Sequence, residues 1–115
     1  MSRELKFRVY SKQYGMSPPC SIFDIQIMDA EGLTDMPQVE IMQYTGLKDK
    51  NGMEIYEGDI LWDSGEYYSP VIWSEDYSGW FIQTYDGPEP LWEMAKESVI
   101  AGNIYDNPEL LKEGD

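Results

Sequence analysis

The sequence predicts a mainly β protein, with an α+β arrangement as the alternative: a small SH3-like barrel with an N-terminal β-hairpin and short helical turns near the C-terminus. Three observations predict this class. Short runs of β-branched and aromatic residues recur along the chain, residues typical of tight turns separate them, and the clearest helical spacing, at residues 88–98, is short. At 115 residues, 42% of them hydrophobic, the chain has the size of one folded domain. We therefore expect a single domain over residues 1–115, with N-terminal strands and loops at 1–38 and a barrel-like portion at 39–115.

The N-terminal portion is expected to contain two strands. Residues 4–11 alternate apolar side chains with basic or polar ones, which predicts a strand with one buried and one basic face. Residues 21–29 are rich in Ile and Phe and predict a second strand. Between them, Gly15 and the pair Pro18–Pro19 predict a connection, so a hairpin joining the two strands is expected.

The barrel-like portion is expected to contain short strands and two short helical segments. Strands are predicted within residues 38–45, 53–62, 71–73, 80–85 and 99–107, and a bend at residues 57–59 divides the second of these ranges, so that another strand starts at Ile60. The segment SEDYSG joins two of these strands and predicts a hairpin turn. One or two helical turns are predicted within residues 88–98, and Asn107, Pro108 and Glu109 have the order of an N-cap, a first-turn proline and an acidic first turn for a brief terminal helix.

The stretch TGLKDKNGMEIYEGDI, residues 45–60, suggests either a cation-binding loop or a turn. If Gly52 takes the invariant glycine position of a calcium-binding EF-hand loop, Leu47 and Gly58 fall at the first and twelfth positions, where carboxylates are required. The pair Asn51–Gly52 between β-rich runs instead predicts a tight turn, because both residues tolerate positive φ. The sequence thus predicts a turn followed by a strand, and no metal site.

Residue usage argues against most kinds of enzyme. The chain has no His, the commonest general base and zinc ligand, and Cys20 is the single Cys, so no intramolecular disulfide forms. Paired carboxylates or a carboxylate-bound Mg²⁺ would be the remaining enzyme alternative, but no spacing singles out a pair. We expect neither catalysis nor a cofactor.

Charge is distributed unevenly along the chain. Residues 1–23 carry four basic residues and one acid, whereas residues 51–95 contain ten acids and no Lys or Arg, and the net charge is -14. An acidic surface repels phosphate backbones, so direct nucleic-acid binding is not expected. A basic protein partner, the basic N-terminal strand of another copy, or simple solubility would each account for this charge. No membrane span or signal peptide is predicted, and a cytoplasmic protein is expected.

Several segments resemble the YopX family of phage and prophage proteins. They are LKFRVYS near the start, MQYTGLKDKNGMEIYEGDIL in the centre, VIW after it and AGNIYDNPELL near the end. The resemblance implies a small, mostly β accessory protein without an assigned activity, in the cytoplasm of a bacterial host, and it transfers no catalytic residue.

The central motif has a structural and a functional interpretation. In the structural interpretation, Gly46, Gly52 and Gly58 adopt backbone conformations that other residues resist. Ile55, Ile60 and Leu61 fill a hydrophobic core. In the functional one, four residues form a partner-binding surface, since Tyr and Trp supply large amphipathic contact area: Tyr44, Tyr56, Asp59 and Trp62.

The leading functional hypothesis is a non-catalytic protein-interaction module, by analogy with other SH3-like barrels. A specific version is self-association through the N-terminal strand that carries Lys6 and Arg8. The alternative is an acidic mimic of DNA that occupies a nucleic-acid-binding protein of the host.

Overall fold

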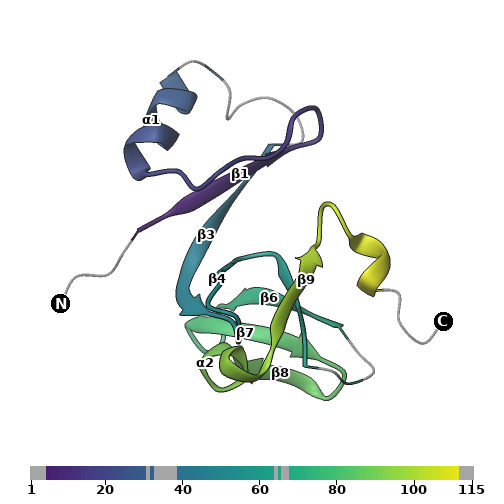
Figure 1. The fold of residues 1–115 in the computed structure, drawn as a ribbon. Coiled ribbons are helices and arrows are strands. Elements are labelled where there is room, and N and C mark those ends of the chain that lie inside the picture. The colour runs from purple at the N-terminus through teal and green to yellow at the C-terminus, as the bar shows by residue number, and fades with distance from the viewer. Residues whose placement is uncertain (1–4, 31, 33–38, 64, 66–67, 112–115) are drawn as a thin grey trace. The chain divides into compact units, whose positions relative to one another are not determined.

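Antiparallel strands make up most of the computed structural model, which describes residues 5–30, 32, 39–63, 65 and 68–111 (Figure 1). The chain divides into two compact units, residues 1–44 and 45–115. The division falls within strand β3 (Val39–Lys48), which begins in the first unit and ends in the second. The mainly β class predicted from the sequence is confirmed.

In the first unit, strand β1 (Phe7–Ser11) lies between β2 (Gly15–Met16) and the first part of β3, and both pairings are antiparallel. Tyr10 faces Met16 in the β1–β2 hairpin, and Val9 faces Ile41 across β1 and β3. The predicted first strand is therefore confirmed, and the N-terminal region contains a hairpin. The second strand of this hairpin, however, is β2 and not the segment 21–29.

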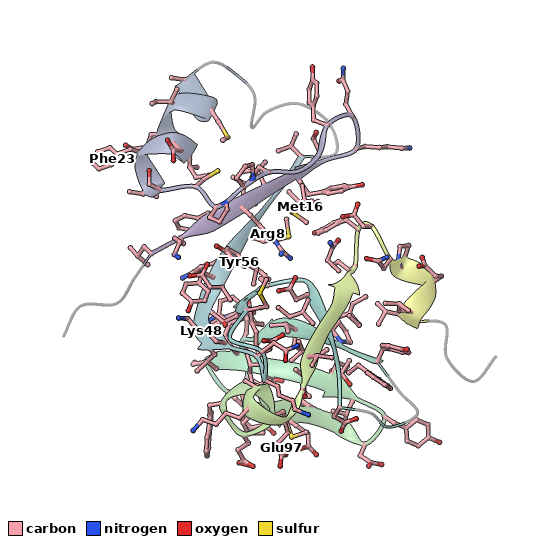
Figure 2. The ribbon with its side chains drawn as sticks, in the orientation of Figure 1. Arg8, Met16, Phe23, Lys48, Tyr56 and Glu97 are labelled. Carbon is pink, nitrogen blue, oxygen red and sulfur yellow. The ribbon has the colours of Figure 1, made fainter. Side chains whose placement is uncertain are left out.

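The strand predicted at residues 21–29 is wrong, because this segment forms helix α1 (Ile22–Ala30). Ser21 and Asp24 form a capping box: the Asp24 Oδ2 atom accepts a hydrogen bond from the Ser21 backbone N–H at 2.9 Å, and the Ser21 Oγ atom accepts one from the Asp24 N–H at 3.1 Å. This local signal outweighs the preference of Ile and Phe for strands. Figure 2 shows the exposed Phe23 side chain projecting outward from the helix.

In the second unit, five antiparallel strands form a curled sheet in the order β8-β7-β6-β5-β9. The strands are β5 (Asp59–Trp62), β6 (Tyr68–Ser74), β7 (Gly79–Thr84), β8 (Gly87–Pro90) and β9 (Val99–Asn103). The pairing of β5 with β9 shifts register between Ile60 and Leu61, and such an irregularity bends a sheet. The last part of β3 lies beside β4 (Glu54–Tyr56). The predicted hairpin of β6 and β7 is confirmed.

The core of the second unit lies between the curled sheet and the short helix α2 (Leu91–Met94), which continues into the 3-10 turn η2 (Ala95–Glu97). Leu91 and Ala95 are four residues apart, on one face of the helical turns, and both are buried. The buried cluster consists of Ile55, Leu61, Val71, Ile82, Leu91 and Ala95. The helical turns predicted within residues 88–98 are confirmed.

The terminal segment forms the 3-10 helix η3 (Pro108–Leu111), which confirms the predicted brief helix. The side chain of Asn107, predicted to cap it, turns back toward β9 instead, where its Oδ1 atom accepts a hydrogen bond from the Asn103 N–H at 3.2 Å. A Cβ atom on Gly102 would lie only 2.7 Å from the Asn107 Cγ atom. Gly102 thus leaves room for the side chain that ties the terminal segment to β9.

Replacing Gly102 with Ala is expected to lower the free energy of unfolding by about 1 to 3 kcal/mol, because the added methyl group overpacks against Asn107. The measurement is urea denaturation of the purified variant. The control is the same substitution in an Asn107→Ala background, where most of the blocking side chain is gone and the additional loss should be smaller. An equal loss in both backgrounds would show that the cause is not this contact.

Candidate functional site

Three of the four residues predicted as a partner surface are buried. The exposed fractions are 6% for Tyr44, 4% for Tyr56 and 1% for Asp59, while Trp62 is half-buried. The four residues make contacts within their own chain. Asp59 Oδ2 accepts a hydrogen bond from the Tyr56 N–H at 2.8 Å, and the Lys6 Nζ atom lies 5.3 Å from the Tyr44 ring centroid. Their role in binding stays a prediction, and the exposed aromatic surface lies elsewhere.

The Trp62 side chain is held at the end of β5 by two contacts. Its indole N–H donates a hydrogen bond to the Gly65 carbonyl oxygen at 2.9 Å, and its ring stacks with that of Tyr68 at a centroid distance of 6.1 Å. The arrangement leaves part of the indole accessible. Among the four predicted residues, Trp62 is therefore the one with substantial area for a partner.

The turn at Asn51–Gly52 is confirmed, and Asp49 holds it. The Asp49 Oδ1 atom accepts hydrogen bonds from the Asn51 and Met53 N–H groups at 2.8 and 2.9 Å, and Oδ2 accepts one from the Ile100 N–H at 3.0 Å. Gly52 has a φ of 83°, whereas Asn51 does not adopt a positive φ, so Gly alone uses the conformational freedom predicted for the pair. Asp49 lies in the stretch 45–60, for which the sequence suggested a cation-binding loop or a turn, and no role in the turn was predicted for its side chain. An Asp two residues before Asn-Gly is also a signal for side-chain-to-backbone bonding within a turn.

The structural interpretation of the central motif is confirmed for its glycine and core residues. Gly58 has a φ of 87°, its N–H donates to the Val71 carbonyl oxygen at 3.0 Å, and its own carbonyl oxygen accepts from the Ile104 N–H at 2.9 Å. Ile55 and Ile60 are fully buried. The motif therefore joins β4, β5, β6 and the segment after β9.

Four aromatic side chains lie on the hairpin of β6 and β7, two of them exposed and two half-buried. We call Trp73, Tyr77, Trp80 and Phe81 the aromatic hairpin. Trp73 and Trp80 face each other across the two strands, with ring centroids 5.1 Å apart in an edge-to-face arrangement. Tyr77 stacks with Phe81 at 5.1 Å. Trp73 is 46% exposed and Tyr77 is 64% exposed, so these two rings offer most of the accessible aromatic area of the hairpin.

The turn of the aromatic hairpin is acidic and geometrically defined. Glu75 and Asp76 are exposed in the four residues between β6 and β7. The Ser74 Oγ atom accepts a hydrogen bond from the Tyr77 N–H at 3.3 Å, and Ser78 adopts a φ of 53°. The sequence predicted this hairpin but did not single out its aromatic residues. Their concentration in the segment WSEDYSGWF was the available signal.

The second unit also has a concave feature, which lies beside the curled sheet. It is a pocket of about 230 Å³. Its lining includes apolar, hydroxyl-bearing and acidic side chains: Leu61, Ile82 and Met94; Ser69, Thr84 and Ser98; and Asp63 and Asp86. The hydroxyl groups of Thr84 and Ser98 donate hydrogen bonds to the carbonyl oxygens of Gly87 and Met94, at 2.6 and 2.9 Å.

The described residues contain no cluster of three or more His, Cys, Asp or Glu side chains with the arrangement of a metal site. Within the same residues, no helix has both the length and the apolar character needed to cross a membrane.

Comparisons with known proteins show similarity to a protein family and to solved structures. A family model described as YopX protein matches residues 6–112. The crystal structure of protein EF1440 from Enterococcus faecalis is similar over 96% of this chain and 99% of that chain, with a TM-score of 0.65 and 25% sequence identity. No curated protein matches.

Proposed function

The chain belongs to the YopX family, and from this we propose that it is a phage or prophage accessory protein that acts as a non-catalytic protein-interaction module in the cytoplasm of a bacterial host. The aromatic hairpin is the observation that carries the proposal. Trp and Tyr rings combine a large apolar area with a polar group and little conformational freedom, and they are enriched at protein interfaces. A soluble domain that exposes Trp73 and Tyr77 on one hairpin offers a partner this kind of contact.

The negative charge around the aromatic hairpin indicates which surfaces of a partner it can contact. Glu75 and Asp76 lie in its turn, and no Lys or Arg occurs anywhere between Asn51 and Ala95. Complementary potentials accelerate association and exclude partners of like charge. We therefore infer a protein partner with a basic or neutral contact surface, whose affinity depends on the aromatic rings and whose association rate depends on salt.

Self-association is the second form of this proposal. The N-terminal strand carries the basic residues, but β1 lies between β2 and β3, and Phe7 exchanges backbone hydrogen bonds with Cys20. The backbone of β1 is thus largely paired within the first unit. A second copy would contact exposed basic side chains such as Lys12, at the tip of the β1–β2 hairpin, rather than add a strand to β1.

DNA mimicry remains the alternative, supported by the ten acids without a basic residue in residues 51–95. Such a mimic presents charges with the spacing of phosphates to a nucleic-acid-binding protein, so its binding falls steeply with salt. Charge reversal of exposed acids such as Asp63, Glu75 and Asp76 would abolish binding to that partner. If binding survives these reversals, mimicry is excluded.

The double substitution Trp73→Ala and Tyr77→Ala is expected to weaken binding to the protein partner by about thirtyfold or more, the loss typical of an interface hot spot. The measurement is the dissociation constant for a partner captured by the wild-type chain. Tyr14→Ala is the matched control, because Tyr14 is an exposed tyrosine of the first unit. Unchanged affinity in the double variant would contradict the proposed role of the aromatic hairpin.

A further inference from the structure

Asn51 and Gly52 are both exposed in the turn between β3 and β4. The backbone nitrogen of the residue after an Asn can attack the Asn side-chain carbonyl carbon and close a five-membered ring. Gly favours this attack, because it has no side chain beside the nitrogen and its backbone rotates freely. A Cβ atom placed on Gly52 would meet no atom within 4 Å, so the space around this residue is open. The turn therefore presents a reactive Asn-Gly pair to solvent.

The other two Asn residues of the chain lack these features. Asn103 precedes the β-branched Ile104, and its Oδ1 atom accepts hydrogen bonds from two backbone N–H groups at 3.0 and 2.9 Å. Asn107 precedes Pro108, which has no N–H to attack the side chain. Among the residues that the structure describes, the Asn51 side-chain amide has no hydrogen-bond partner. Asn51 is thus set apart from the other two by its neighbour and by its freedom to rotate.

Hydrogen bonds of the turn restrain the reacting groups. The Gly52 N–H donates to the Asp49 carbonyl oxygen at 3.0 Å, so the attacking nitrogen is engaged while the turn is closed. The N–H groups of Asn51 and Met53, on either side, donate to the Asp49 Oδ1 atom. Attack requires the peptide unit between Asn51 and Gly52 to leave this arrangement. Exposed turns open locally without unfolding of the chain, so the frequency of opening limits the reaction.

We propose that Asn51 is a site of spontaneous deamidation and that the turn held by Asp49 sets its rate. The Gly52 nitrogen bonds to the Asn51 Cγ atom, the bond from Cγ to the side-chain nitrogen breaks, and ammonia leaves with the proton that Gly52 gives up. Water then opens the resulting succinimide ring. Cleavage between Cγ and the Gly52 nitrogen gives aspartate, and cleavage at the main-chain carbonyl gives isoaspartate. Water is the only co-reactant, and no atom is oxidised or reduced.

The products weaken the turn that restrains the reaction. Either product places a second carboxylate close to that of Asp49, which the Asn51 N–H already contacts at 2.8 Å, and like charges at this range repel. Isoaspartate also lengthens the backbone by one carbon, which changes the spacing of the N–H groups bonded to Asp49. The Asp49 Oδ2 atom accepts a hydrogen bond from the Ile100 N–H, so the change also loosens the link to β9. We therefore expect the converted chain to unfold at a lower urea concentration.

The test is incubation of the full chain at mildly alkaline pH, followed by site-resolved mass spectrometry. Residue 51 is expected to gain the mass of an amide-to-acid conversion, at a rate that rises in proportion to hydroxide, while Asn103 and Asn107 stay unchanged. A blocked peptide of residues 47–56 gives the rate without the fold, and the chain should react about tenfold more slowly than this peptide. Equal conversion at all three Asn residues, or no conversion at residue 51 over about thirty half-lives of the peptide, would overturn the proposal.

Two variants separate opening of the turn from unfolding. Asp49→Ala removes the acceptor that holds the turn and is expected to accelerate conversion at residue 51 about fivefold or more. Asp59→Ala is the matched control, because Asp59 is a buried acid of the same unit whose bond to the Tyr56 N–H lies outside this turn, and its effect should stay below about twofold.

Equal acceleration in both variants would show that unfolding of the unit, and not the turn, sets the rate. If Asp49→Ala does not fold, Asp49→Asn replaces it, since the amide retains one acceptor oxygen and should accelerate conversion by a smaller factor. An Asp49→Asn chain that folds and reacts at the wild-type rate would likewise contradict the role of the turn.

Discussion

Replacing Asp49 with Ala is expected to lower the free energy of unfolding by about 3 to 5 kcal/mol. The carboxylate accepts hydrogen bonds from three backbone N–H groups, two in the Asn51–Gly52 turn and one at Ile100 in β9. Hydrogen bonds to charged groups contribute roughly 1.5 to 3 kcal/mol each, and losses at one site are not additive. The side chain thus connects the turn after β3 to β9, far along the sequence. Urea denaturation followed by tryptophan fluorescence measures the loss.

Asp49→Asn is the matched control for this substitution. The amide keeps one acceptor oxygen in nearly the same shape, so it can retain the bonds within the turn while the amide nitrogen replaces the other acceptor. A loss of about 1 to 3 kcal/mol is expected, smaller than for Ala. If Ala and Asn destabilise the chain equally by less than about 1 kcal/mol, the role of Asp49 as the clamp of this turn is contradicted.

Replacing Asp59 with Ala is expected to lower the free energy of unfolding by about 2 to 4 kcal/mol. Asp59 is 1% exposed, and its loss removes the acceptor for the Tyr56 N–H within a buried bend. A buried donor left without a partner costs roughly 1 to 3 kcal/mol, and the cavity adds to it. Thermal and urea unfolding of Asp59→Ala, with Asp59→Asn as the isosteric control, measure the effect.

The substitution Asp59→Asn also distinguishes the structural interpretation of the central motif from the functional one. A purely structural role predicts that Asp59→Asn, which preserves the shape, keeps partner binding in proportion to the folded fraction. A folded Asp59→Asn variant that loses its partner would instead support the sequence-based prediction that Asp59 belongs to a binding surface. The comparison therefore requires both a stability measurement and an affinity measurement on the same protein.

Elements with strong local signals were predictable from the sequence. The alternation around Phe7 and Val9 gave β1, the turn residues 74–79 gave the β6–β7 hairpin, and the spacing of Leu91 and Ala95 gave α2. These patterns are local, and tertiary packing reinforces them. The same reasoning identified the Asn51–Gly52 turn.

The errors arose where two signals competed. In α1, Ile and Phe favoured a strand, but the Ser21–Asp24 capping box started a helix. Strand β8 was not predicted, because Pro88 and Pro90 discourage a strand. It lies at the edge of the sheet, where proline is tolerated.

The candidate site was less predictable than the fold. Alternation shows which side chains share a face but not how deeply a face is covered, and β3 has apolar residues on both faces. The burial of Tyr44 and Tyr56 therefore depended on neighbours distant in sequence. The aromatic hairpin became apparent only when its pairing placed Trp73 beside Trp80 and left both Trp73 and Tyr77 accessible.

The most direct test of the central claim is affinity capture from a lysate of the natural host, with the wild-type chain and the Trp73→Ala, Tyr77→Ala double variant side by side. Captured proteins are identified by mass spectrometry after washes across a salt series. Our account expects a protein that resists moderate salt and is retained by the wild-type chain but lost from the double variant. The account would be contradicted if both chains captured equal amounts of nucleic-acid-binding proteins alone and released them at modest salt.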